Sequence, residues 1–185
     1  MNNDFTIGHY YVEGDNKDIQ KLSNLFDSLI KEPYRYVETT LGDLREALEL
    51  ETNESKYLSS VVNDWELDDD TTFYFSSEYA WAVNDIVEII ETAFPKTKIY
   101  FMVEDLGNKE IITNDVEGKH FKERYYAECQ FDDGTDEGFF DTEDEALNYL
   151  CKSLGIECSK SSLAKWKLAN GDGDTYATYY PILVV

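Results

Sequence analysis

The residues of this chain that could carry out chemistry are carboxylates, and they gather in two acidic segments. The first segment contains Asp64, Glu66, Asp68, Asp69 and Asp70. The second has eight carboxylates in fourteen residues and no basic residue: Asp132, Asp133, Asp136, Glu137, Asp141, Glu143, Asp144 and Glu145. Paired carboxylates can serve as general acid and base, whereas dense negative charge can bind a cationic surface. The functions to weigh are therefore an enzyme, a protein-binding module and a mimic of nucleic acid.

No motif for phosphate binding, serine hydrolysis or zinc proteolysis accompanies the carboxylates. The chain has no P-loop, GxGxxG, GxSxG or HExxH sequence. The two histidines, His9 and His120, are far apart, and His9 is expected to lie on a strand surface and not to act as a ligand or base. Residues 170–174 begin like a calcium loop, but Thr175 occupies a position that needs glycine, which favours a turn. We predict no catalytic residue, no cofactor and no metal site.

The acidic segments have a structural explanation and a functional one. Residues 132–145 can form a solvated hairpin followed by a helix N-terminus, where the helix dipole favours acidic side chains. Alternatively, the whole second segment joins the first as a negative, DNA-like surface that occupies the groove of a nucleic-acid-binding protein. Such mimicry needs carboxylates at phosphate-like intervals in three dimensions, which spacing along the chain does not establish.

Aromatic side chains offer a further contact surface. Tyr79 and Trp81 follow a predicted strand, and Tyr176, Tyr179 and Tyr180 lie near the end of the sequence. Tyr and Trp are enriched at the centres of interfaces, so either group could form a contact patch. Trp81 and Tyr180 are equally expected in the core.

Four lysines make the last two predicted helices locally basic: Lys152, Lys160, Lys165 and Lys167. Such charge segregation could pair copies of the chain head to tail. Anchoring of the helices to the acidic body of the same chain is the simpler explanation, and we favour it.

The composition is acidic but foldable. Thirty-nine Asp and Glu against sixteen Lys and Arg give a formal charge of −23, which repels phosphate and anionic lipid. We therefore expect a protein partner with a basic surface, no direct binding to nucleic acid and no membrane association. Hydrophobic residues at 42% and aromatic residues at 15% are enough to build a core. Three cysteines without a CxxC pair, and no signal peptide or apolar span, predict a cytoplasmic protein.

Residues 4–105 are predicted to form a βαββαβ unit. In its first helix the apolar residues Ile19, Leu22 and Phe26 recur at the three- and four-residue steps of one buried face. The predicted elements are strands over residues 5–12, 57–65, 71–76 and 98–104, helices over about 15–31 and 81–94, and a turn at Asp68-Asp69-Asp70. Right-handed crossovers place both helices on one face of an antiparallel sheet, which is the ferredoxin-like sandwich. A short helix around residues 41–48 is expected within an insertion at about 34–55.

Residues 118–185 are predicted to be a ββααβ extension packed on this domain, which spans residues 4–117. The predicted elements are strands over residues 121–131 and 137–140, helices over 142–154 and 161–168, and a last strand over 175–184, with a short strand over 110–113 before them. The turn at Asp132-Asp133-Gly134 joins the first two strands. Thr142 and Glu145 match a capping box, and Gly155 is placed to end that helix.

Part of the chain resembles a known family. The stretch from Thr72 to Trp81 (TFYFSSEYAW), the helix that ends Ala93-Phe94-Pro95 and the strand from Ile99 to Glu104 resemble the YubB-like ferredoxin-like family. Residues 10–15 (YYVEGD), which lead into a helix, are similar to the opening of that family, and the resemblance covers about residues 5–118. Its members are small proteins of unknown function, often carried on plasmids, phages and other mobile elements. The resemblance implies a ferredoxin-like fold and a mobile-element context, and it rests on aromatic and turn spacing and not on a catalytic signature.

We therefore expect a non-enzymatic protein-interaction protein, an accessory factor of a mobile genetic element. The alternatives are an acidic nucleic-acid mimic that inhibits a DNA-binding or defence system, and an enzyme that uses paired carboxylates. The candidate interaction surface consists of Asp64, Glu66, Asp68, Asp69, Asp70, Tyr79, Trp81, Asp132, Asp133, Asp136 and Glu137.

Overall fold

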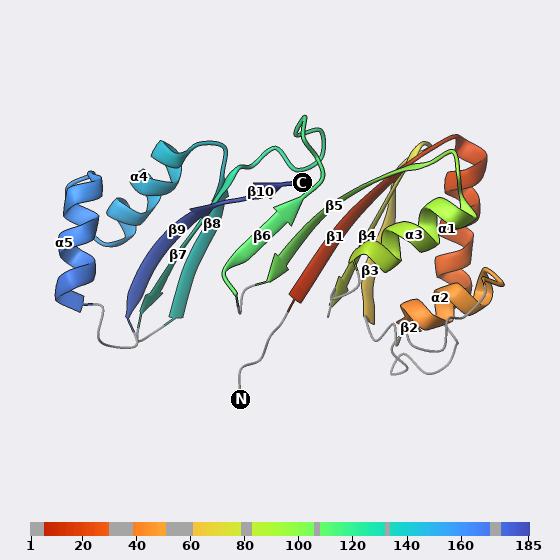
Figure 1. The fold of residues 1–185 in the computed structure, drawn as a ribbon, viewed down its shortest axis with the longest axis horizontal. Helices are drawn as coiled ribbons and strands as arrows, with labels where there is room; N and C mark the ends of the chain where they lie inside the picture. Colours follow the sequence, from red (N-terminus) through yellow and green to blue (C-terminus); the bar gives the residue numbers. More distant parts are fainter. Residues whose placement is uncertain are drawn as a thin grey trace. The chain divides into compact units, whose positions relative to one another are not determined.

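The chain is a mixed α+β protein that divides into two compact units. The computed structural model describes residues 6–29, 39–50, 61–78, 83–105, 108–131, 134–170 and 175–185. The N-terminal unit is Met1–Asp115 and the C-terminal unit is Val116–Val185. Each unit has its own sheet and its own helices (Figure 1). The α+β class predicted from the sequence is confirmed.

The described strands of the N-terminal unit form one antiparallel sheet with helices packed on one side. Its elements are β1 (Thr6–Glu13), α1 (Asn16–Leu29), β2 (Thr39–Thr40), α2 (Leu41–Ala47), β3 (Val61–Asp69), β4 (Thr72–Glu78), α3 (Val83–Ala93), β5 (Lys98–Asp105) and β6 (Glu110–Thr113). Within this unit the strand order is β6-β5-β1-β4-β3-β2. Figure 1 shows α1 and α3 on the same side of the sheet. The short helix expected within the insertion is α2.

The core of the N-terminal unit lies between the sheet and these helices. Ile19, Leu22 and Phe26 of α1 are buried, as their spacing predicts. The Phe26 ring packs against Phe73 and Phe75 of β4, with centroid distances of 4.9 and 5.1 Å. Aromatic rings in such tilted and edge-on contact contribute more than their buried area alone. These contacts fix which face of the sheet points to the helices.

Strand alternation then decides which residues point away from the helices. In β1, Tyr10 and Val12 are fully buried in this core. Because successive side chains of a strand point to opposite faces, His9 and Tyr11 lie on the other side of the sheet. We call that side of the N-terminal sheet the helix-free face.

The turn between β3 and β4 differs from its prediction. The sequence indicates a strand that ends at Trp65 and a turn at residues 68–70, whereas β3 continues to Asp69 and the chain turns at Asp70 and Thr71. The Asp69 carboxylate accepts hydrogen bonds from the Thr71 amide at 2.7 Å and from the Thr71 hydroxyl at 2.8 Å. These bonds move the turn towards the C-terminus, because an Asp side chain that binds the backbone two residues ahead sets where the chain reverses.

Three of the described strands of the C-terminal unit form an antiparallel sheet, and the unit also has two helices. Its elements are β7 (Tyr125–Phe131), β8 (Gly134–Phe140), α4 (Glu143–Ser153), α5 (Lys160–Asn170), β9 (Tyr176–Pro181) and β10 (Leu183–Val184). The order in the sheet is β8-β7-β9. Leu147 and Leu150 of α4 and Leu163 of α5 pack with Ala127 and Cys129 of β7 in a second core.

The predicted boundaries of α4 are confirmed in detail. The Thr142 hydroxyl accepts a hydrogen bond from the Glu145 amide, and the Glu145 carboxylate accepts one from the Thr142 amide, which is the predicted capping box. Gly155 has φ of 64°, in the left-handed region where glycine is favoured, and it follows the end of the helix as predicted.

Three strand boundaries of the C-terminal unit were wrong. The first predicted strand begins at Tyr125 and not at residue 121, because Arg124 organises a loop there: its guanidinium donates to the carbonyl oxygens of Phe121 and Glu123 at 2.5 and 2.9 Å. The next strand begins at Gly134, three residues earlier than predicted. The last strand is interrupted at Ile182, whose amide donates to the Arg124 carbonyl at 2.8 Å. Sequence periodicity does not reveal these hydrogen bonds, and the bond between Ile182 and Arg124 joins residues far apart in the sequence.

None of the described helices is both long enough and apolar enough to cross a bilayer.

Candidate interaction surface

A row of tyrosines crosses the helix-free face of the N-terminal sheet and ends at a carboxylate. The strand register pairs Glu66 of β3 with Tyr74 of β4, Tyr74 with Tyr11 of β1, and Tyr11 with Tyr100 of β5. The rings of Tyr11 and Tyr74 are tilted against each other with centroids 5.1 Å apart. Tyr11 and Tyr74 are half-buried, whereas Tyr100 is buried. Four residues from four strands therefore form one line across the sheet.

A second, parallel row runs beside the tyrosines. It consists of Asp64, Ser76, His9 and Met102, again one residue from each of β3, β4, β1 and β5. His9 Nδ1 is hydrogen-bonded to the Tyr74 hydroxyl at 2.8 Å, so the two rows are joined. His9 Nε2 lies 3.7 Å from Glu104 Oε1. Burial lowers the pKa of His9, so the imidazole is mainly neutral near pH 7 and this contact is not a full ion pair.

Three carboxylates of β3 provide the charge of this face. Asp64, Glu66 and Asp68 are exposed, and no hydrogen bond or ion pair from another described residue engages them. Burial and then the negative charges of Asp68 and Glu66 raise the pKa of Tyr11. Burial, and then Tyr11, Asp64 and Glu66, likewise raise the pKa of Tyr74. Both hydroxyls therefore stay protonated, and the carboxylates are close enough to act on them.

We call Tyr11, Tyr74, Asp64, Glu66 and Asp68 the tyrosine–carboxylate face. Aromatic rings with neighbouring carboxylates suit a cationic group, because the ring faces attract cations and the carboxylates neutralise them. The unit already contains one such contact, since the Lys98 ammonium lies over the Tyr100 ring, 4.3 Å from its centroid. Nucleic-acid bases also stack on tyrosines, but the exposed carboxylates would repel the attached phosphates. The face is therefore suited to Arg and Lys side chains.

The rest of the first acidic segment has a structural role or no described partner. The Asp69 carboxylate is held in the turn by Thr71, and hydrogen bonds from Thr71 lower its pKa. Asp70 is an exposed turn residue. Only Asp64, Glu66 and Asp68 of the five predicted residues thus belong to the tyrosine–carboxylate face.

The second acidic segment is engaged within its own unit. Asp136 accepts hydrogen bonds from the Tyr149 hydroxyl at 2.5 Å and the Ser153 hydroxyl at 2.9 Å. Glu137 accepts one from the Tyr126 hydroxyl at 2.6 Å. These contacts favour the structural explanation of Asp136 and Glu137 over direct participation in binding, because part of the hydrogen-bonding capacity of each carboxylate is already used.

One of the basic residues of the last helices is an anchor. Lys160 Nζ lies 2.6 Å from Glu143 Oε1, and Glu143 also accepts a hydrogen bond from the Tyr179 hydroxyl at 3.0 Å. The pairing joins the start of α5 to the start of α4 within one unit. It agrees with the preferred explanation of the lysines for Lys160.

Some predicted site residues lie outside the described part of the chain. They are Tyr79, Trp81, Asp132 and Asp133, together with residues 171–174 of the calcium-like sequence. Conversely, the sequence interpretation missed Tyr11 and Tyr74 as site residues. Their signal was the alternation of polar aromatic and apolar residues in the two strands, but only the pairing of β1 with β4 brings them together.

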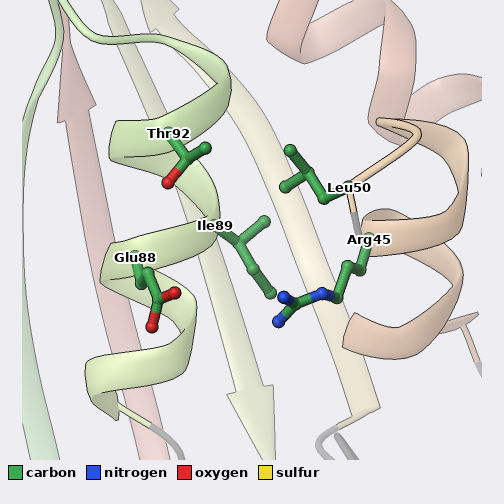
Figure 2. A pocket seen from close by; sticks show the side chains of 5 residues that line it. All are labelled: Arg45, Leu50, Glu88, Ile89 and Thr92. Atoms are coloured by element: carbon green, nitrogen blue, oxygen red, sulfur yellow. The ribbon is translucent and has the colours of Figure 1, made fainter. Parts of the chain in front are cut away.

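A small cavity lies elsewhere in the N-terminal unit, between α2 and α3. It has a volume of about 190 Å³ and is lined by Arg45, Leu50, Glu88, Ile89 and Thr92. Figure 2 shows the Arg45 side chain extending from α2 towards Ile89 of α3. The lining contains one carboxylate, whereas catalysis by paired carboxylates needs two. Across the described residues, His, Cys, Asp and Glu side chains also form no group of three suited to hold a metal ion.

Comparison with known proteins adds no relative: no family model, no curated protein and no solved structure matches this chain.

Proposed function

We propose that the protein is a non-enzymatic interaction protein that binds a basic segment of a partner protein on its tyrosine–carboxylate face. The observation that carries the proposal is the tyrosine row beside three exposed carboxylates that no described residue neutralises. Arg is the best matched side chain, because its planar guanidinium can stack on a tyrosine ring and donate to a carboxylate at once. The net charge of −23 would also speed the encounter with a basic partner.

The wider setting of this function belongs to the same proposal. We infer a ferredoxin-like N-terminal unit, which the adjacent antiparallel strands in the order β5-β1-β4-β3, with α1 and α3 on one side, support. A cytoplasmic location agrees with three free cysteines. The resemblance of residues 5–118 to mobile-element proteins supports a role as an accessory factor of such an element.

Binding of a model peptide tests the proposal. An arginine-rich peptide is titrated into the protein by calorimetry and compared with a lysine-rich peptide of the same length and charge. We expect tighter binding of the arginine-rich peptide. The variant Asp64→Asn/Glu66→Gln/Asp68→Asn should weaken it roughly tenfold at low salt, since three exposed pairs of less than about 1 kcal/mol each are lost. Tyr11→Leu/Tyr74→Leu should weaken it about fivefold through loss of cation–π contact.

A matched variant separates local binding from general charge attraction. Glu46→Gln/Glu91→Gln/Glu157→Gln removes the same number of negative charges from exposed positions elsewhere. It should reduce affinity much less than the change on β3, because a contact charge acts at short range and a remote one is screened by salt. Equal losses in the two triple variants would show that the tyrosine–carboxylate face is not the binding site.

A nucleic-acid mimic is the second candidate, favoured by the repeated charge on β3. Asp64 and Glu66 are two positions apart in the strand, so they point to the same side and lie about 6.7 Å apart along its axis. The mimic would occupy a DNA-binding groove. In that case the chain displaces double-stranded DNA from the partner, and the tyrosine substitutions leave displacement unchanged while the carboxylate substitutions abolish it. If the partner instead binds by stacking its arginines on Tyr11 and Tyr74, the tyrosine substitutions should weaken binding to the partner.

A further inference from the structure

Two cysteines meet where α4 ends and α5 begins. Cys151 lies in the last turn of α4 and is 1% exposed, whereas Cys158 precedes α5 and is exposed. Both are free thiols, as is the buried Cys129 of β7. Six residues separate Cys151 from Cys158. The connection between α4 and α5 brings Cys151 and Cys158 together, whereas Cys129 lies in β7.

The end of α4 reverses the chain towards Cys151. The Gly155 amide donates to the Lys152 carbonyl at 3.2 Å, and the Ile156 amide donates to the Cys151 carbonyl at 3.0 Å. With Gly155 in the left-handed conformation, these two bonds form a Schellman motif, which satisfies the last carbonyls of a helix and turns the chain back. The residues that follow are thereby directed along α4.

Cys158 then lies on the face of α4 that carries Cys151. Its thiol donates a hydrogen bond to Asn148 Oδ1, with a sulfur–oxygen distance of 2.7 Å. Asn148 precedes Cys151 by three residues, and residues three apart share one face of a helix. Cys151 also lies near enough to the Cys158 thiol to raise its pKa. The exposed thiol is thus held beside the buried one.

We propose that Cys151 and Cys158 form a reversible disulfide that joins the end of α4 to the start of α5, with a low-molecular-weight disulfide as oxidant. The Cys158 thiolate attacks one sulfur of that disulfide, forms a mixed disulfide and releases one thiol. The Cys151 thiolate then attacks the Cys158 sulfur, breaks the mixed disulfide and releases the second thiol. Two electrons pass from the protein to the oxidant, and the two protons of the cysteines end on the released thiols.

The same environment limits how fast this exchange occurs. Burial, then Cys151 and then Asp144 raise the pKa of the Cys158 thiol. Little thiolate is present near pH 7, so Cys158 reacts more slowly than cysteines whose thiolate is stabilised. Cys129 is also a poor nucleophile, because its side chain is fully buried and burial raises the pKa of its thiol to about 11. The pair therefore responds to sustained oxidation, and Cys129 does not compete.

Mass spectrometry of the full chain tests the proposal. The protein is incubated with oxidised glutathione at mildly alkaline pH, and its intact mass and peptide map are recorded. We expect a mass lower by about 2 Da, a peptide cross-link between Cys151 and Cys158, and reversal by dithiothreitol. Cys158→Ser should lose the reaction, and Cys151→Ser should stop at a glutathione adduct on Cys158.

The peptide map of the unaltered chain decides the matter even where a buried substitution impairs folding. A persistent glutathione adduct on Cys158 would show that Cys151 does not reach it. A cross-link that involves Cys129, a disulfide-linked dimer, or unreacted thiols after the incubation would equally overturn the assignment.

Discussion

At the scale of single residues, the described carboxylates of the two acidic segments differ in whether a tyrosine hydroxyl donates a hydrogen bond to them. Three carboxylates of the C-terminal unit accept hydrogen bonds from tyrosines: Asp136 from Tyr149, Glu137 from Tyr126 and Glu143 from Tyr179. Those of β3 in the N-terminal unit have no such bond from a described residue. Similar densities of acidic residues along the sequence therefore correspond to fold stabilisation in one unit and to an exposed charged surface in the other.

The Asp136 carboxylate makes the stability of the C-terminal unit depend on pH. Hydrogen bonds from Tyr149 and Ser153 lower the pKa of this carboxyl below its ordinary value of 3.8. Its contribution is therefore fully present above that value and is lost as the pH falls through the folded-state pKa. We expect Asp136→Asn to be less stable than the unaltered protein at pH 7, and the difference to shrink as the pH falls below 3.8.

Urea unfolding at several pH values, followed by circular dichroism, measures this effect. Glu157→Gln is the matched control, because Glu157 is an exposed carboxylate of the same unit. A difference between Asp136→Asn and the unaltered protein that stayed constant from neutral to acid pH would contradict a role for the charge of Asp136.

At the scale of elements, the end of α4 requires glycine at position 155 because of its backbone conformation and not because neighbouring atoms leave no room for a side chain. A Cβ built on Gly155 meets no atom within 4 Å, so a substitution there meets no steric obstacle beyond its own backbone. The positive φ of 64° alone penalises other residues. We expect Gly155→Ala to lower the free energy of unfolding by about 1 kcal/mol, and Gly155→Asn to lower it less, since Asn tolerates this conformation.

The comparison of the two Gly155 variants in urea unfolding checks the argument. Equal losses in the two would point to a cause other than the left-handed backbone, because Ala and Asn differ in how readily they adopt it. Gly155→Ala should also slow formation of the Cys151–Cys158 disulfide, since the Schellman motif directs Cys158 towards α4.

Elements with local signals were predictable from the sequence. The apolar spacing of Ile19, Leu22 and Phe26 marks the buried face of α1, and Thr142 with Glu145 marks the start of α4. Such features depend on residues within one or two turns of each other. They need no knowledge of the tertiary fold.

Features fixed by contacts distant in sequence were not predictable. The loop before β7 depends on Arg124, whose backbone pairs with Phe140 and Ile182. The tyrosine row depends on the register of β1 with β4 and β5, which joins residues more than sixty positions apart. A shift of that register by one residue would move Tyr11 to the other face. The carboxylates of the candidate site could therefore be predicted from the sequence, whereas its tyrosines, Tyr11 and Tyr74, could not.

At the scale of the whole molecule, the excess of negative charge opposes folding. A net charge of −23 on 185 residues creates repulsion that the compact state must overcome. Dissolved salt screens charges separated by more than about 10 Å at 0.1 M ionic strength. We therefore expect the melting temperature to rise as sodium chloride increases from about 0.01 to 0.5 M, over which the screening length falls severalfold. Chloride is the suitable salt, since sulfate stabilises proteins by exclusion from their surface as well.

A variant with fewer charges distinguishes repulsion from other effects of salt. Asp64→Asn/Glu66→Gln/Asp68→Asn removes three negative charges from neighbouring exposed positions on β3. Its melting temperature should exceed that of the unaltered protein at low salt. The difference in melting temperature should close at high salt, because salt then screens the same repulsion that the substitutions remove. Differential scanning fluorimetry across the salt series measures both slopes. A melting temperature that is lower in the variant at every salt concentration would mean that these carboxylates stabilise the fold, and would assign them to the same structural class as Asp136.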